Sequence, residues 1–471
     1  MKVPMRSPAR TIVIIGGGFC GTALATQLLR GALTQPTHVI VVERRAQLGR
    51  GVAFEQSAFP HLLNVPSQRM SADVSDELQF ARFARQRGDA LAAERFLPRP
   101  LYGEYLEQRL LEAVSAAPPQ ISFSHIRAQA DALHRIDAHG PYLVSLSNEQ
   151  HLLADDVVLA CGDPPPTDPG CASLIAQHPA YVRNPFDERA LQADTAQLLL
   201  IGTGLTMADV AIAAAALNPH INIHAMSRHG LLPAVQSCAT TRGFCDEFQG
   251  YLPSGALSAR GLLRGFRAML RAAQRGGHDW RDALASARDA APELWHRLPQ
   301  SERARFLRHL RLRWDVHRHR MPPLTAERLS QLRRSGRLQI HAGRLQGFED
   351  VDQGHRLRVQ WRARGAGASE ALRELTVDRV VNCAGTDSRL TATQDPLLGG
   401  LIRSGLASAD GLGLGLRTGA AGALVGADGQ VASHLYYIGP MLRAQHWEAT
   451  AVGELRRHAQ QLADALRQVV A

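Results

Sequence analysis

Short apolar runs alternate with helical segments at the beginning of the chain. Residues 11–15 form one apolar run, residues 16–21 are rich in glycine, and residues 22–30 have the composition of a helix. A second apolar run at 39–42 ends at Glu43. Continuous apolar strands that alternate with helices are typical of a parallel sheet covered on both faces. The first 45 residues therefore predict a strand, a glycine turn, a helix and a second strand.

The same pattern returns in the middle of the chain. Three consecutive prolines at 164–166 indicate a boundary near residue 165. Beyond it, residues 198–201 predict a strand, and a second glycine turn opens a helix that runs to about Leu217. A further strand from about Ile221 leads to Ser227 and Arg228. This second βαβ unit is the closest feature to an internal duplication.

Other segments follow different patterns. Residues 121–153 alternate like a β-meander, and residues 338–361 are again strand-like. The segment from about 245 to 335 is helical and rich in arginine, which predicts a helical insertion. One predicted helical face there carries four large apolar side chains, Phe306, Leu307, Leu310 and Trp314. A helix is expected from about Trp447 to Val470.

The first glycine turn has the spacing Gly16-x-Gly18-x-x-Gly21. Gly16 permits a tight turn, Gly18 leaves room for a pyrophosphate, and Gly21 lets the helix pack closely. The helix N-terminus offers free N–H groups and partial positive charge to phosphates. Glu43, at the end of the next strand, can accept the ribose hydroxyls of an adenosine. The pattern predicts a dinucleotide site; the alternative is a glycine turn that only packs.

The second turn, with Gly202 and Gly204, departs from this spacing because Met207 stands where a third glycine would be. We therefore expect looser or differently spaced helix packing there. Ser227 and Arg228 replace the acidic residue after the following strand. An arginine there can stack on adenine and pair with a 2′-phosphate, which favours NADPH over NADH.

Two further strands, at 157–162 and 380–385, end in glycine. They fit a chain that leaves an FAD domain, builds an inserted NAD(P) domain and returns, although ordinary buried strands can also end in glycine turns. We therefore expect an α/β protein with two Rossmann-like dinucleotide-binding domains and a helical insertion. The FAD domain would span 1–165 and 376–471. The NAD(P) domain would span 166–375, with its insertion at about 245–335.

Composition excludes several classes of chemistry. The net charge is +10, but Lys2 is the only lysine, so no Schiff-base or P-loop lysine is available in the body of the fold. Arginines are interspersed with acids and lack interleaved aromatic residues, which argues against nucleic-acid binding. The six cysteines contain no CxxC pair, which argues against a redox disulfide and a zinc site. No HExxH or EF-hand pattern is present either, so no metal site is expected. No apolar run is long enough for a membrane span, and we expect a cytoplasmic protein.

Two residue groups invite a functional interpretation that we weigh against a structural one. Cys20 in the first turn could be reactive, but a small packed residue is the simpler interpretation. The run 317–320 is His-Arg-His-Arg. Histidines two apart point to different sides of a helix, so metal ligation is not expected. Arg318 and Arg320 remain candidates for a basic rim that faces an anionic substrate. The alternative is that they form a charged helix end exposed to solvent.

The sequence resembles the bacterial FAD/NAD(P)-binding protein family labelled YdhS-like, which is related to flavin N-hydroxylating monooxygenases. The resemblance runs from about residue 11 to the C-terminus. It is carried by these segments: GGGFCG, GVAF, HLLNVPSQRMSA, VVLACGDPPP, LLLIGTGLTMAD, SRHGLLP, HRHRMPP and LYYIGPMLRAQHWEATAV. One member type of that group is the FAD-dependent urate hydroxylase.

The resemblance implies that NADH or NADPH reduces FAD and that one oxygen atom of dioxygen reaches a small electron-rich substrate. The most specific expectation is conversion of urate to 5-hydroxyisourate. By the same resemblance Gly51 and Asn64 lie near the isoalloxazine and Gly439 lies beneath the flavin. The glycine ending of the strand at 157–162 places Gly162 near a cofactor as well. No residue is singled out as an acid or base. Two alternatives remain: a flavin-dependent dehydrogenase or reductase without oxygen insertion, and a non-catalytic nucleotide-binding regulatory protein.

Overall fold

The computed structural model describes residues 9–33, 35–55, 59, 61–88, 95–137, 140–237, 246–367, 370–386, 388–390 and 393–468. Lys2, Cys238, Cys245 and the end of the expected C-terminal helix lie outside these residues. The chain forms two compact units. The first unit comprises residues 1–164, 241–305 and 388–471, and the second comprises 165–240 and 306–387. Each unit contains one of the two predicted βαβ repeats.

A six-stranded sheet forms the centre of the first unit, in the order β15-β16-β7-β1-β2-β3. Neighbouring strands are parallel except at the β15–β16 edge. The strands are β1 (Arg10–Ile15), β2 (Thr37–Val42), β3 (Ile121–Ile126), β7 (Asp156–Leu159), β15 (Ala423–Val425) and β16 (Val431–Tyr437). Because Ile15 pairs with both Val42 and Leu159, the three central strands end at the same level.

The side chains of β1 alternate between two cores, as expected for a sheet covered on both faces. Ile12 and Ile14 belong to a core with α1 (Phe19–Arg30) and α12 (Val452–Gln468). Val13 and Ile15 belong to the core on the opposite face. That core includes a separate antiparallel sheet of β4 (Ala130–Arg135), β5 (Tyr142–Leu146) and β6 (His151–Ala154).

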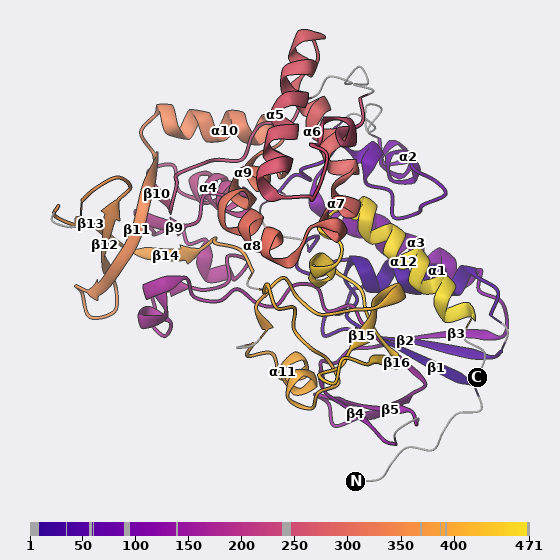
Figure 1. The fold of residues 1–471 in the computed structure, drawn as a ribbon. Coiled ribbons are helices and arrows are strands. Elements are labelled where there is room, and N and C mark those ends of the chain that lie inside the picture. The colour runs from indigo at the N-terminus through magenta and orange to yellow at the C-terminus, as the bar shows by residue number, and fades with distance from the viewer. Residues whose placement is uncertain are drawn as a thin grey trace. The chain divides into compact units, whose positions relative to one another are not determined.

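Helix α3 (Arg99–Ser115) lies with α1 and α12 on one face of the sheet of the first unit, and α1 packs against both α3 and α12 (Figure 1). The remaining helices of this unit are α2 (Gln79–Gln86), α5 (Ala259–Arg275), α6 (Trp280–Asp289), α7 (Ala291–Arg297) and α11 (Pro396–Arg403). The expected meander at 121–153 is only partly correct. Its first strand, β3, joins the main sheet parallel to β2, and only β4–β6 pair as a meander.

A seven-stranded sheet forms the centre of the second unit, in the order β13-β12-β11-β10-β9-β14-β8. Its strands are β8 (Tyr181–Val182), β9 (Gln197–Ile201), β10 (Asn222–Ser227), β11 (Leu338–Asp350), β12 (Leu357–Ala363), β13 (Arg373–Val377) and β14 (Arg379–Asn382). Its helices are α4 (Leu205–Leu217), α9 (Arg311–Arg318) and α10 (Pro323–Arg334), while α8 (Gln300–His309) crosses the division between the units.

The units differ from the expected domain boundaries in two places. Strand β14 pairs in parallel with β9, with Val380 opposite Leu199, so residues 376–387 belong to the second unit. The expected helical insertion is divided between the units. Helices α5, α6 and α7 belong to the first unit, where Trp295 stacks on Trp447 with ring centroids 4.6 Å apart. Helix α9 belongs to the second, where the Ala234 N–H donates to the carbonyl of Val316 at 2.8 Å.

Two helices also differ from expectation. The predicted apolar face at 306–314 is interrupted, because α8 ends at His309 and α9 begins at Arg311. Neither helix has a buried residue, so this face is half-buried. The last helix begins at Val452, after a turn in which Trp447 is buried. Among the described helices, none has the length and apolar character needed to cross a membrane.

Candidate nucleotide-binding sites

The first glycine turn requires glycine at its first and third positions. Gly16 has φ +110°, and a Cβ atom there would lie 2.5 Å from the carbonyl oxygen of Ala160. A Cβ atom on Gly21 would collide with the carbonyl oxygen of Gly16 and lie 3.3 Å from a methyl group of Ile14. Helix α1 therefore packs directly against the turn, as the spacing predicts.

Gly18 has a different reason for being glycine. Its φ of −73° suits any residue, and the nearest atom to a Cβ there would be the Cα of Gly51, at 3.7 Å. Gly18 is the N-cap of α1, and no side chain caps this helix. By contrast, Ser258, Asp279 and Asp395 cap helices α5, α6 and α11. The first N–H groups of α1 are thus available to an anion, which the helix dipole also favours.

Glu43 is attached to this turn. Its carboxylate accepts hydrogen bonds from the N–H groups of Gly17 at 2.9 Å and Arg45 at 3.0 Å. The residue is 8% exposed. A carboxylate has about four acceptor positions, so acceptor capacity remains for ribose hydroxyls. The structure therefore brings Glu43 next to the glycine turn.

The loop that carries Gly51 docks on the same turn. The Gly49 N–H lies 2.8 Å from the carbonyl of Gly17 and 3.0 Å from the hydroxyl of Thr22. The buried Arg50 side chain donates to the carbonyl of Pro100 at 3.0 Å and to Glu107 at 2.9 Å. These bonds fix the loop so that Gly51 faces Gly18.

Gly162 and Gly439 are connected through Tyr437, a residue that the sequence does not single out. The fully buried Tyr437 phenol donates to the carbonyl of Gly162 at 3.1 Å and accepts from the N–H of Met441 at 3.0 Å. Burial raises the pKa of this phenol well above its usual value. A Cβ atom on Gly439 would lie 2.5 Å from the same phenol oxygen. Tyr437 thus positions both predicted glycines.

Asn64 is not joined to this set by hydrogen bonds. Its segment is attached instead to residues 95–99, where the Leu63 N–H donates to Leu97 and the Arg99 N–H to His61. Within the part of the chain that the structure describes, the half-exposed Asn64 side chain has no hydrogen-bond partner. Its expected place near the flavin stays a prediction.

The second turn has the same backbone arrangement as the first. The Gly16 N–H donates to Val42 at 2.8 Å, and the Gly202 N–H donates to Met226 at 2.7 Å. Gly202 has φ +117°, and its Cβ would lie 2.7 Å from the carbonyl carbon of Cys383. Gly204 is the N-cap of α4, again without a side-chain cap, and a Cβ there would meet no atom within 4 Å.

The second turn differs from the first at its third position. Met207 is fully buried, so α4 leaves room for a long side chain where α1 has Gly21. This agrees with the expected difference in helix spacing.

Hydroxyl groups hold the segment after β10 against this turn. The Thr203 hydroxyl donates to the carbonyl of Leu231 at 2.6 Å and lies 2.9 Å from the Ser227 hydroxyl. Ser227 in turn accepts from the N–H of Gly230 at 3.0 Å. Ser227 therefore stabilises the loop, and its neighbour Arg228 is exposed.

Arg318 and Arg320 lie at the end of α9 in the second unit. Arg318 is the last residue of α9 and Arg320 follows the helix; both are partly exposed. The next residue, Met321, donates its N–H to the carbonyl of Ala234, in the segment that follows Arg228. Their assignment to a substrate rim stays a prediction.

The Cys20 thiol is not prepared for reaction. Burial, with smaller contributions from Asp163 and Cys161, raises its pKa to about 12. A thiol with such a pKa is protonated at neutral pH and is a poor nucleophile. This supports the interpretation of Cys20 as a packed residue.

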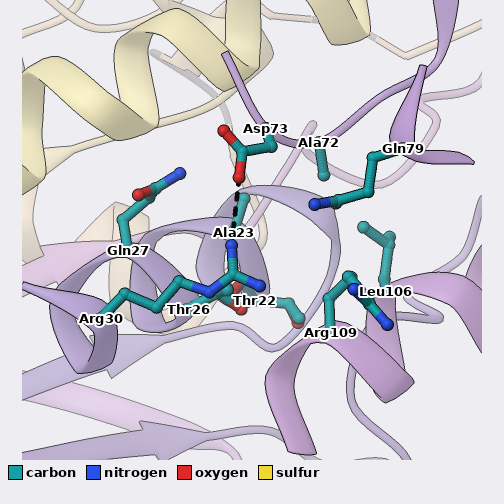
Figure 2. Close-up of a pocket in the computed structure, with 10 residues that line it drawn as sticks. All are labelled: Thr22, Ala23, Thr26, Gln27, Arg30, Ala72, Asp73, Gln79, Leu106 and Arg109. Atoms are coloured by element: carbon teal, nitrogen blue, oxygen red, sulfur yellow. Dashed lines mark hydrogen bonds and ion pairs between the residues drawn. The ribbon is translucent and has the colours of Figure 1, made fainter. Parts of the chain in front are cut away.

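One pocket of the first unit lies along α1, between this helix, α3 and residues 72–79 (Figure 2). The Arg30 guanidinium reaches Asp73 across it, at 3.1 Å. None of the residues predicted to bind a cofactor lines this pocket. It is therefore separate from the surface formed by the glycine turn.

Comparisons with known proteins agree with this geometry. Residues 13–164 match the family described as FAD-NAD(P)-binding. No match was found among curated proteins. The structure is similar to L-lysine 6-monooxygenase from Pseudomonas syringae, with a TM-score of 0.66 and 18% identity over 98% of this chain and 99% of that one.

Two ornithine hydroxylases are also similar. The enzyme from Pseudomonas aeruginosa in its reduced form has a TM-score of 0.64 and 14% identity. The ornithine N-hydroxylase from Kutzneria sp. 744, with reduced FAD, NADP+ and L-ornithine, has a TM-score of 0.60 and 17% identity. Both comparisons cover 98% of this chain and 99% of the other. Residues 13–164 thus match the FAD-NAD(P)-binding family model, in a chain that has the overall fold of these hydroxylases.

Proposed function

We propose that this protein is an FAD-dependent monooxygenase that takes electrons from NAD(P)H. The observation that carries the proposal is the presence of two equivalent glycine turns, each opening an uncapped helix, in a chain with the fold of such enzymes. One turn would serve each dinucleotide, FAD in the first unit and NAD(P)H in the second.

The first unit has the features that FAD requires. A diphosphate would bind at the N-terminus of α1, where Gly18 leaves space and N–H groups are available. The adenosine ribose would bind to the remaining acceptor positions of Glu43. The docked loop at Gly51 and the turn at Gly439 would border the flavin. This assignment gives each of the three spaced glycines, Gly16, Gly18 and Gly21, a physical reason for its identity.

The second unit offers a comparable place for NAD(P)H. The diphosphate would bind at the N-terminus of α4, next to Gly204. The ribose would lie at the end of β10, beside Ser227 and Arg228. Ser227 stands where the first unit has Glu43 and carries no negative charge, and the positively charged Arg228 follows it, so this arrangement favours NADPH.

Flavin chemistry, when the cofactor is bound, supplies hydride acceptance from NAD(P)H and transfer of one oxygen atom of dioxygen to an electron-rich substrate. The chain itself binds and orients the two nucleotides and limits water near them. Buried groups such as Tyr437 position the backbone around the first site, and none of them is assigned a proton-transfer step.

The substrate is proposed to be a small electron-rich molecule. Urate, converted to 5-hydroxyisourate, is the candidate from the sequence resemblance, and Arg318 and Arg320 are the residues proposed to face it. The similar structures carry the names of enzymes that act on ornithine, lysine and cadaverine. Primary amines of this kind therefore belong in the same test as urate.

The test measures NADPH oxidation, oxygen uptake and product in the FAD-loaded protein. One compound among urate, L-ornithine, L-lysine and cadaverine is expected to stimulate oxygen uptake and to appear as a hydroxylated product by mass spectrometry. Oxidation of NADPH to an external electron acceptor, with no oxygen incorporated from ¹⁸O₂ into any product, would instead support a reductase. A protein that binds neither FAD nor NADPH would contradict both enzyme assignments.

A further inference from the structure

The loop after β10 lacks an acid where the first unit has Glu43. The Gly16 N–H donates to Val42, which precedes Glu43, and the Gly202 N–H donates to Met226, which precedes Ser227. Ser227 therefore corresponds to Glu43, and Arg228 is the next residue. An acid at this position recognises the two free hydroxyls of an adenosine ribose. The adjacent guanidinium of Arg228 cannot accept those hydrogen bonds, because it has donors only.

A second arginine, Arg364, follows β12, whose neighbour β11 pairs with β10. Ser227 pairs with Ala342 of β11, and the Arg364 N–H donates to the carbonyl of Ala342 at 2.9 Å. Gly230 lies against the same residue, since its Cβ would be 3.1 Å from the Cβ of Ala342. The turn after β12 therefore starts next to the loop that carries Arg228.

A third arginine comes from α9. The segment that follows Arg228 runs alongside the end of this helix, where the Ala234 N–H donates to Val316 and the Met321 N–H donates to Ala234, both at 2.8 Å. Arg313 lies one turn before Val316 on α9. All of these residues belong to the second unit.

The three guanidinium groups share one electrostatic environment. Partial burial lowers the pKa of His229, and the charges of Arg364, Arg228 and Arg313 lower it further. Each of the three arginines is exposed. Within the described part of the chain, none of them forms an ion pair with a carboxylate. Their combined positive charge is thus uncompensated by the protein itself.

We propose that Arg228, Arg313 and Arg364 together bind the 2′-phosphate of NADPH and make the second site selective for NADPH over NADH. The inference rests on the proposed binding of NAD(P)H at the Gly202 turn. A phosphate monoester carries close to two negative charges near neutral pH and accepts paired hydrogen bonds from a guanidinium. NADH has an uncharged hydroxyl at this position and gains nothing from the three charges. The bonds among Thr203, Ser227 and Gly230 hold the loop in place before the ligand arrives.

The test compares 2′,5′-ADP with 5′-AMP, using isothermal titration calorimetry on the full-length protein in phosphate-free buffer. The two probes differ only in the 2′-phosphate and lack the nicotinamide, so the readout does not depend on flavin activity. In the wild type, 2′,5′-ADP should bind at least about tenfold more tightly than 5′-AMP. Arg228→Ala, Arg313→Ala and Arg364→Ala should each weaken 2′,5′-ADP binding about three- to tenfold and leave 5′-AMP binding unchanged.

Arg264→Ala is the matched control, because Arg264 is an exposed arginine on α5 without an ion pair among the described residues. This variant should bind both nucleotides as the wild type does. Equal affinity for both probes in the wild type, or an Arg264→Ala effect as large as the other three, would overturn the phosphate assignment while leaving a nucleotide site at the Gly202 turn. Binding of neither probe would instead remove the proposed NAD(P)H site and this inference with it.

Discussion

Gly202 packs against the carbonyl group of Cys383, a residue that immediately follows β14 and is distant in sequence. A Cβ atom on Gly202 would lie 2.7 Å from that carbonyl carbon, and Gly16 has the same relationship to Ala160, at 2.8 Å. In both units the glycine turn is therefore completed by the loop after a neighbouring strand. Each turn depends on its assembled sheet.

This packing predicts a large loss of stability when Gly202 is replaced by alanine and a small one when Gly204 is replaced. Gly202→Ala should lower the free energy of unfolding of the second unit by about 1–3 kcal/mol, because alanine at a positive φ is strained and its methyl group meets Cys383. Gly204→Ala should change it by less than about 1 kcal/mol, since the site is open and φ is −86°. Urea denaturation followed by circular dichroism measures both. Equal losses in the two variants would show that the packing against Cys383 is unimportant.

Glu43 is expected to contribute to FAD affinity through its charge. Glu43→Gln keeps the shape and one acceptor for the Gly17 N–H but removes the carboxylate. We expect the FAD dissociation constant to rise about tenfold, which corresponds to about 1.4 kcal/mol. Quenching of flavin fluorescence during titration of FAD-free protein measures the change. The buried polar control Thr26→Val, one helical turn beyond Thr22, should leave the affinity unchanged.

A buried ion pair stabilises the first unit at the start of its parallel strands. Arg10 binds Asp156 at 2.7 Å, and Asp156, which is 0% exposed, also accepts from His434 at 2.9 Å. Asp156→Asn should destabilise this unit by about 3–5 kcal/mol, because it removes a buried negative charge that faces the buried Arg10 guanidinium. Glu104→Gln, which removes the exposed pair with Arg87, should cost less than about 1 kcal/mol. If urea denaturation shows similar losses of unfolding free energy for both variants, the stabilising role of the buried Arg10–Asp156 pair is contradicted.

The same carboxylate predicts a pH dependence at His434. The hydrogen bond that His434 donates to Asp156 raises the pKa of His434 above its ordinary value of 6.5. The stabilisation is therefore complete below about pH 6.5 and is lost as the pH rises through the folded-state value. Proton NMR titration should show a His434 pKa above 6.5 in the wild type and a lower one in Asp156→Asn.

His224 predicts the opposite pH dependence in the second unit. Its ring lies 3.0 Å from that of His341 between neighbouring strands, and burial together with His341 lowers its pKa to about 4. The unfolded chain then binds more protons than the folded one between about pH 6.5 and pH 4, so stability falls across this window as the pH decreases. His224→Gln should remove much of this acid sensitivity. Thermal unfolding between pH 7 and pH 4 measures it, and unchanged sensitivity would contradict the prediction.

The sequence predicted much of the fold because the chemistry of each βαβ unit is local. Apolar runs of about five residues, a glycine turn and a helix lie within 45 residues. The sequence therefore predicted β1, α1 and β2 directly, with Glu43 directly after β2. The fold class with two Rossmann-like sheets is confirmed. The same local pattern identified β9, α4 and β10, although Met207 breaks the glycine spacing.

Long-range pairing could not be read in this way. The apolar run of β14 is the same whether it joins the first sheet or the second, and only its pairing with β9 decides. Tyr437 looks like any buried aromatic residue until its phenol is seen between Gly162 and Met441. Arg313 and Arg364 are two of many arginines, and only the register of β10, β11 and β12 brings Arg364 beside Arg228. The proximity of these arginines can therefore be recognised only in the tertiary structure.

The central claim is that the N–H groups at the start of α1 hold the diphosphate of FAD. The most direct measurement is FAD binding to FAD-free Gly18→Ala and Gly204→Ala variants, two N-cap positions that both accept a methyl group without a clash. We predict that Gly18→Ala weakens FAD binding by at least about tenfold with unchanged stability of the FAD-free protein, whereas Gly204→Ala binds FAD as the wild type does. Wild-type FAD affinity in Gly18→Ala, or an equal loss in both variants, would contradict the account.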